Sequence, residues 1–260
     1  MDWAPHLTAV LAGSFVGGSL NLIGGGGSIL AVPLMIYVVG ISDPHVAIGT
    51  SALAVAVSAF VTFVQHWRAG TVKWPCAIVF AIAGVFGAAL GSFLGKNVNG
   101  NVLLFLFSLV MMVVAAATLI RREDAPDADI HLTPRMAPRL IAFGFGAGAI
   151  SGFFGIGGGF LIVPGIMLGS GMPIVNAIGS SLFSVGAFGT TTAFNYALSG
   201  LIDWRVALEF IGGGAIGGLI GMRASLALSR RKRALNYLFA GIVFAAAIYM
   251  AIRGGLSLAA

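Results

Sequence analysis

A glycine-rich stretch interrupts apolar sequence twice in this chain and limits what it can fold into. The first copy covers residues 21–33 and the second covers residues 152–164, and each ends in a proline. Glycine weakens a helix, and a proline a few residues later fits only the first turn of a new one, so each copy predicts helix, break and helix. If the break lies within a bilayer, its bare N–H groups need a polar partner, because lipid offers none. We expect that partner to be a substrate.

The composition predicts a membrane protein. Hydrophobic residues make up 58% and charged residues 8% of the 260 residues, which excludes a water-soluble globule. The apolar stretches are long enough to cross about 30 Å of hydrocarbon at roughly 1.5 Å per residue. The net charge of +6 lies at their ends, where the positive-inside rule explains it, so no nucleic-acid partner is expected. We predict an all-α polytopic protein of the bacterial inner membrane, with the lipid bilayer as a partner.

The apolar segments have recognisable boundaries. In the first half the expected helices cover approximately residues 7–23, 28–39, 44–65, 75–94 and 102–120. Asp43 followed by Pro44 predicts a helix start, because a capping carboxylate and a proline suit the first positions. The polar stretch at residues 121–139 predicts a linker. We therefore expect a first transmembrane repeat at residues 1–121, a cytoplasmic linker at 122–138 and a second repeat at 139–260.

The second half repeats the first at an offset of 130 to 131 residues. The matches are Pro33 with Pro164, Ile48-Gly49-Thr50-Ser51 with Ile178-Gly179-Ser180-Ser181, Trp74 with Trp204, and Gly84, Gly87 and Gly91 with Gly214, Gly217 and Gly221. Duplicated halves with broken helices in equivalent positions are typical of secondary transporters, whose site lies where the halves meet.

The basic residues indicate how the halves are oriented. If each glycine-rich unit counts as two segments, each half has five, and eleven of the fourteen Lys and Arg residues fall on the cytoplasmic side. If it counts as one segment, only six do. The positive-inside rule therefore favours inverted repeats with both termini outside. Each half is expected to hold a broken helix or a re-entrant hairpin, between which charge cannot decide, plus three transmembrane helices.

The candidate binding groups are neutral, because only Glu209 and Arg223 place charge within apolar segments, near their ends. Helix N-termini offer free N–H groups and partial positive charge, and hydroxyls add donors, which suits a small anion. The expected substrate-binding residues are Asn21, Gly26, Gly27, Ser28, Thr50, Ser51, Gly157, Gly158, Gly159, Ser180, Ser181, Thr192 and Asn195. His66 and Glu209 are candidates for gating or a proton relay. No metal site and no cofactor are expected.

These residues also have structural interpretations. The hydroxyls of Thr50, Ser51, Ser180 and Ser181 could bond back to their own helices. His66 stands beside Trp67, as an interfacial residue would, and His6 is expected to be solvated. Other glycines form rows that predict close helix packing: Gly87, Gly91 and Gly95, and Gly213, Gly217 and Gly221.

The two glycine-rich units, each followed by a proline and by Ile-Gly-Thr/Ser-Ser, resemble the TauE/SafE family of membrane proteins over nearly the whole chain. The resemblance implies export of sulfite or related organosulfur anions, and some members are linked to uptake of sulfonates or other organic anions. We therefore expect a secondary transporter, an exporter, for an anion of the sulfite, sulfoacetate or sulfonate class.

Three other functions are alternatives to export. An anion channel and an importer of organosulfonates are the near alternatives, and a homodimer is left open. An intramembrane hydrolase would need a histidine base near Ser51 or Ser181. His66 lies about 22 Å from Ser51 along their helix, so no enzyme is expected.

Overall fold

The computed structural model describes residues 4–120, 133, 136–227 and 232–259, and every regular element in these ranges is helical. The elements are α1 (Ala4–Ile23), the 3₁₀ helix η1 (Gly24–Leu30), α2 (Ala31–Tyr37), α3 (Pro44–Arg68), α4 (Trp74–Lys96), α5 (Gly100–Ile120), α6 (Ala137–Phe154), α7 (Gly159–Ser170), α8 (Ile174–Ala197), α9 (Trp204–Ala227) and α10 (Lys232–Ala259). Most of the expected linker, residues 122–138, lies outside the described residues.

The helix boundaries follow local chemistry. Asp43 is the N-cap of α3, its carboxylate accepts the His45 N–H at 2.8 Å, and Pro44 begins the helix, which confirms that expectation. Pro33 is the third residue of α2, within the first turn. The same expectation for Pro164 was wrong, because α7 already begins at Gly159 and the proline lies inside it. The left-handed Gly158 starts this helix earlier than the proline would.

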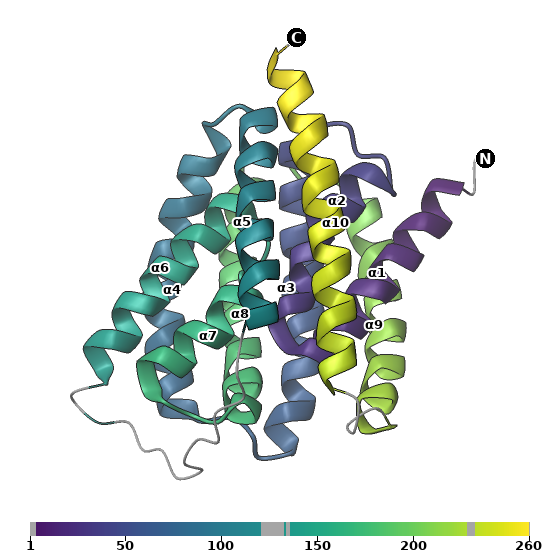
Figure 1. Ribbon diagram of the computed structural model, residues 1–260. Helices are drawn as coiled ribbons and strands as arrows, with labels where there is room; N and C mark the ends of the chain where they lie inside the picture. The colour runs from purple at the N-terminus through teal and green to yellow at the C-terminus, as the bar shows by residue number, and fades with distance from the viewer. Residues whose placement is uncertain (1–3, 121–132, 134–135, 228–231, 260) are drawn as a thin grey trace.

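The two halves of the sequence interleave in space. Helix α1 packs along α9, and α4 packs along α6 (Figure 1). Helix α3 lies against α8 between these pairs, and α5 packs on α10. Each of these pairs joins one helix from the first half to one from the second. The core therefore forms between the halves rather than within each half.

Rows of glycines allow the helices of two pairs, α1 with α9 and α4 with α6, to approach each other closely. A Cβ atom added to Gly213 or Gly217 of α9 would collide with a backbone carbonyl of α1. A Cβ atom added to Gly87 or Gly91 of α4 would collide with a carbonyl of α6 in the same way. The prediction that these rows are packing faces is confirmed, because only glycine lets the backbones come this close.

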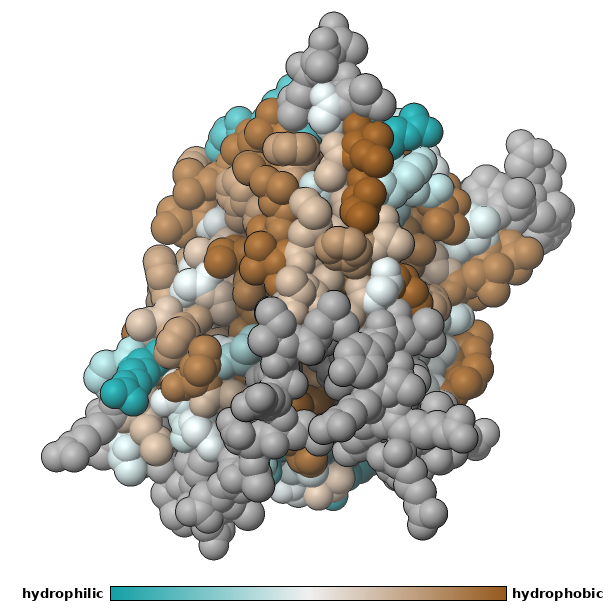
Figure 2. Space-filling model, viewed as in Figure 1, coloured by the Kyte–Doolittle hydropathy of each residue, from teal (hydrophilic) through white to brown (hydrophobic). Residues whose placement is uncertain are grey.

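The outside of the bundle is apolar. Helices α3, α4, α6 and α8 are long and apolar enough to cross a membrane, and shorter apolar helices lie beside them. Most of the visible coloured surface in Figure 2 is hydrophobic, and hydrophilic residues gather toward its upper and lower edges. Large side chains such as Phe86, Ile82 and Leu219 are more than half exposed. This surface suits contact with lipid, and it confirms an all-α membrane protein.

Candidate functional site

The second glycine-rich break is a sharp turn between α6 and α7. Gly155, Gly157 and Gly158 have φ angles of 67°, 64° and 65°, in the left-handed region that glycine enters without strain. The Gly155 N–H bonds back to the Ser151 carbonyl and closes α6. Helix α7 then begins at Gly159, so its first N–H groups have no partner within the helix. The turn thus presents a helix N-terminus.

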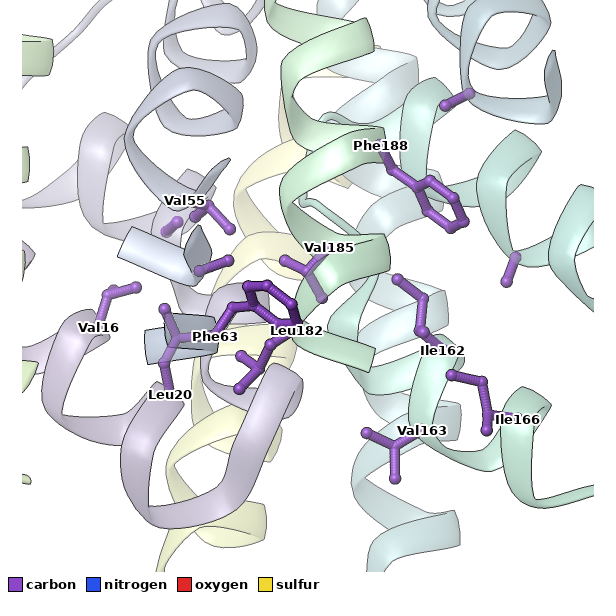
Figure 3. Close-up of a cluster of buried hydrophobic side chains, with 14 of the residues drawn as sticks. Val16, Leu20, Val55, Phe63, Ile162, Val163, Ile166, Leu182, Val185 and Phe188 are labelled. Atoms are coloured by element: carbon purple, nitrogen blue, oxygen red, sulfur yellow. The ribbon is translucent and has the colours of Figure 1, made fainter. Parts of the chain in front are cut away.

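This turn reaches the middle of the bundle. A Cβ atom added to Gly157 would lie 2.8 Å from a methyl of Val55 on α3 and 3.2 Å from one of Val185 on α8. Val55 and Val185 occupy equivalent positions in the two repeats, and Figure 3 shows both among buried apolar side chains. The break therefore lies between the halves, where the sequence analysis places the site, and its surroundings exclude bulk water.

A serine beside this turn was missed by the sequence analysis. Ser151 is fully buried, and its Oγ has no hydrogen-bond partner among the described residues. A Cβ atom added to Gly158 would lie 2.7 Å from this oxygen, so the hydroxyl stands next to the start of α7. A buried hydroxyl without a partner costs about 1–3 kcal/mol. The signal available in the sequence was a serine one helical turn before Gly155.

The first break has a related arrangement. Gly27 of η1 packs on Ser19 of α1, whose Oγ donates to the Val16 carbonyl at 2.8 Å. Ser28 is fully buried on η1. Because η1 packs against both α7 and α8, the structure brings the two breaks together. The side chain of Asn21 and the surroundings of Gly26 lie outside the part of the chain that the structure describes.

Thr50 and Ser180 join the two halves. The Asp203 N–H at the start of α9 donates to Thr50 Oγ1 at 3.0 Å. The Lys73 N–H at the start of α4 donates to Ser180 Oγ, also at 3.0 Å. The two bonds are equivalent in the repeat, and each crosses from one half to the other. These hydroxyls therefore act as acceptors at helix starts.

The neighbouring serines bond to their own helices. Ser51 Oγ donates to the Ile48 carbonyl at 3.0 Å and lies 3.5 Å from the Gly155 carbonyl, at the edge of the second break. Ser181 Oγ donates to the Ile178 carbonyl at 2.8 Å. Ser51 is thus the hydroxyl of the two that contacts a glycine turn.

Thr192 and Asn195 lie farther along α8. Thr192 is seven residues beyond Val185, about 10 Å along the helix axis. It is fully buried, and its Oγ1 has no partner among the described residues. The Asn195 amide donates to Ser92 Oγ of α4 at 2.7 Å and accepts from Lys96 Nζ at 2.7 Å. The structure thus places this pair at the crossing of α4 and α8, not at the glycine turns.

The gating candidates have polar partners elsewhere. His66 Nδ1 lies 3.0 Å from Thr71 Oγ1, in the connection after α3. Glu209 Oε1 lies 2.7 Å from His6 Nδ1, so this pair joins α9 to α1. His6, which was expected to be solvated, is 34% exposed and also pairs with Glu209. The described residues hold no cluster of three or more metal-ligating side chains.

Comparison with known proteins identifies the family. A model described as sulfite exporter TauE/SafE matches residues 9–250. The chain belongs to the TauE/SafE family. A probable membrane transporter protein of Xylella fastidiosa is 48% identical over 255 residues, which cover 98% of each chain. The probable transporter YunE of Bacillus subtilis is 27% identical over 233 residues, or 82% of this chain and 85% of that protein. No solved structure matches the chain.

These matches define the class of this TauE/SafE protein. The family and the relatives are membrane transporters rather than enzymes, which agrees with the expectation from the residues. The chain covers nearly the whole length of the Xylella relative, so the comparison applies to the complete bundle.

Proposed function

We propose that this protein is a secondary transporter that exports a small anion of the sulfite, sulfoacetate or sulfonate class across the bacterial inner membrane. The observation that carries the proposal is the fully buried Ser151 hydroxyl, which has no partner among the described residues and lies beside the left-handed Gly158. An anion at this point would accept from that hydroxyl and from the first N–H groups of α7. The family membership supports transport as the activity.

The proposed site binds an anion without a charged side chain. The N-terminus of α7 carries a partial positive charge of approximately +0.5 together with free N–H groups. Gly157 and Gly158 allow an oxyanion to approach the backbone, because no Cβ stands in the way. Val55 and Val185 keep water out, which strengthens each hydrogen bond. The first glycine-rich break, η1, contributes Gly27 and Ser28 to the proposed site.

Inverted repeats account for the arrangement of helices. Each half contributes five helical segments if η1 and α2 count as one, which is odd, so two similar halves would have opposite directions. The pairing of α1 with α9 mirrors that of α6 with α4, and the Thr50–Asp203 bond mirrors the Ser180–Lys73 bond. The glycine turn between α6 and the shorter α7, which has 12 residues, would form the broken crossing or hairpin of the second half. The α1 and α2 hairpin would enter from the other side.

The test is substitution of Ser151 by alanine. Removing a donor to a charged acceptor costs about 1–3 kcal/mol, so Ser151→Ala should weaken anion binding roughly 5- to 150-fold. Because the hydroxyl has no partner among the described residues, its loss should leave the free energy of unfolding unchanged or slightly higher. Calorimetry of purified protein with sulfite, sulfoacetate, taurine and sulfate measures the affinity, and thermal unfolding without ligand measures the stability.

The control is Ser108→Ala on α5, whose hydroxyl donates to the Phe105 carbonyl. This variant should bind the anion as the parent does. If Ser151→Ala binds with the parent affinity, or loses stability and affinity together, the site lies elsewhere. The crossing of α4 and α8, with Thr192 and Asn195, would then be the next place to look.

The alternatives differ in kinetics. A carrier in proteoliposomes should show saturable flux and counterflow of labelled anion against unlabelled anion. A channel would show neither counterflow nor saturation at millimolar substrate. An importer would show counterflow, but it would accumulate substrate under the ion gradient of a living cell.

A further inference from the structure

The internal repeat lets two helix crossings be compared within one molecule. The crossing of α4 with α8 is equivalent to the crossing of α9 with α3. At an offset of 130 residues, Phe188 of α8 corresponds to Ser58 of α3, Thr192 to Thr62 and Asn195 to Gln65. A molecule with exact two-fold symmetry would pack both crossings alike. This one does not.

The α4–α8 crossing is closed. The Phe188 ring is fully buried, and it fills the space over Gly84 of α4, where no Cβ would fit. Figure 3 shows this ring pointing away from Val185 and from the centre of the cluster. It stacks on Phe80 with ring centroids 6.2 Å apart. An aromatic pair thus seals the middle of the crossing.

A lysine latch closes the end of the same crossing. Lys96, the last residue of α4, donates from Nζ to the Asn195 carbonyl at 3.0 Å, to Asn195 Oδ1 at 2.7 Å and to Ser199 Oγ at 2.9 Å. The Asn195 amide donates in turn to Ser92 Oγ. All three donors of the ammonium group therefore bind the C-terminal end of α8. We call this set of contacts the Lys96 latch.

The equivalent α3–α9 crossing holds a pocket instead. The small Ser58 faces Gly214, and the pocket runs along α3 from Val57 to Gln65. Its volume is approximately 20 Å³, which is room for about one water molecule. The buried Gln65 Oε1 has no partner in the described protein, so a water or a polar ligand would satisfy it. The sequence has Leu226 at the position of Lys96, so the latch lysine is not repeated in the second half.

We infer that the structure is one state of an alternating-access cycle, in which the α3–α9 crossing, now holding a pocket for one water, widens to admit the small anion, while the Lys96 latch keeps the α4–α8 crossing closed. Inverted repeats exchange conformations when the open side changes, so the open crossing should close as the latch breaks. Ser58, Thr62 and Gln65 then form the polar lining of the access path. The inference rests on the proposed transporter function.

The experiment compares two equivalent threonines. Cys76 is the one cysteine of the chain, so Cys76→Ala gives a cysteine-free parent. Thr62→Cys and Thr192→Cys are added singly, and each is reacted in detergent, without substrate, with sulfonatoethyl methanethiosulfonate, a small anionic thiol reagent. We expect Thr62→Cys to react roughly tenfold or more faster than Thr192→Cys. Adding Lys96→Met should raise the Thr192→Cys rate by a similar factor and lower the Thr62→Cys rate.

The controls distinguish a reciprocal change of the two crossings from a general loss of helix packing in the variant. Lys96→Arg keeps donors at the latch and should leave both rates near their parent values. Asn195→Leu removes the latch from the other side, and it replaces Lys96→Met if that variant does not purify as a monodisperse protein. A reciprocal change in the two rates supports the inference. Equal rates in the parent, or a rise of both rates when the latch is removed, overturn it.

This result is independent of the substrate site. If Ser151→Ala leaves anion binding unchanged but the two rates change reciprocally, the proposed site fails and the gate stands. If binding falls as expected and the rates do not change, the gate fails and the site stands.

Discussion

Buried hydroxyl groups in this protein have different roles, depending on whether another part of the protein forms a hydrogen bond with them. Thr50 accepts the Asp203 N–H across the boundary between the halves, whereas Ser151 lies beside a glycine turn with no partner among the described residues. Removing the first leaves a backbone donor unpaired, and removing the second does not. Measurements of the free energy of unfolding can therefore distinguish a hydroxyl that stabilises the fold from one that is available to a ligand.

Thr50→Val tests the structural role. Valine has the shape of threonine without the acceptor, so the Asp203 N–H loses its partner, and the free energy of unfolding should fall by about 1–3 kcal/mol. Thr50→Ser keeps the oxygen and should lose much less. Unfolding in mixed micelles of detergent and sodium dodecyl sulfate measures both. Equal losses in the two variants would show that the methyl group, not the hydrogen bond, matters.

The sequence was informative about backbone breaks and less so about side-chain roles. Gly155 to Gly159 predicted the turn, because clustered glycines weaken any helix, and the duplication made it a candidate site. The role of Thr50 could not be predicted, since its partner Asp203 is 153 residues away. Ser151 was overlooked for a similar reason: that its hydroxyl lacks a partner depends on the packing around it.

Among the helices, α9 shows most plainly how glycine position decides packing. Gly213 lies against α1, where an added Cβ would collide with the Val10 carbonyl, whereas Gly212 next to it has open space. The Ser14 hydroxyl of α1 also donates to the Gly213 carbonyl at 3.0 Å. The position of Gly213 is thus a contact point with α1, and the position of Gly212 is open.

Gly213→Ala and Gly212→Ala form a matched pair. Overpacking should make Gly213→Ala less stable by approximately 1–3 kcal/mol, since α1 must move away. Gly212→Ala should be neutral or more stable by up to about 1 kcal/mol, because alanine favours a helix. The measurement is the difference in the free energy of unfolding between the two variants. Loss of stability in both variants would mean that the position of Gly212 is packed as tightly as that of Gly213.

Helix extents were predictable to within a few residues, because apolar length and caps are local properties. The exceptions lie at the breaks. Residues Gly24–Leu30 form a 3₁₀ helix where the sequence favoured an earlier start of the second helix, and Pro164 lies inside α7. Both depend on how the broken segments pack between α3 and α8, and helix periodicity does not record that packing.

At the scale of the whole molecule, inverted halves predict opposite sides for equivalent loops. Ala69, after α3, should be cytoplasmic, and Leu198, after α8, should be external, although the two lie within one residue of equivalence. Single cysteines at these positions in the Cys76→Ala parent can be labelled with an impermeant maleimide in intact cells. Leu198→Cys should react before lysis and Ala69→Cys only after it. Reaction of both on one side would indicate parallel repeats.

The pairing of α1 with α9 also has a consequence for biosynthesis. The Ser14 hydroxyl bonds to the Gly213 carbonyl, which is synthesised 199 residues later. At about 5–20 residues per second, the ribosome needs on the order of 10–40 seconds to supply that partner. Until then Gly13 and Gly17 of α1, which lie against the α9 backbone in the folded protein, have only lipid or an insertion factor to contact. Helix α4 likewise lacks α6 until the second half is made. We therefore expect the nascent first half to be more exposed to quality-control proteases than the complete bundle, and two separately expressed halves each to survive only when the other is present.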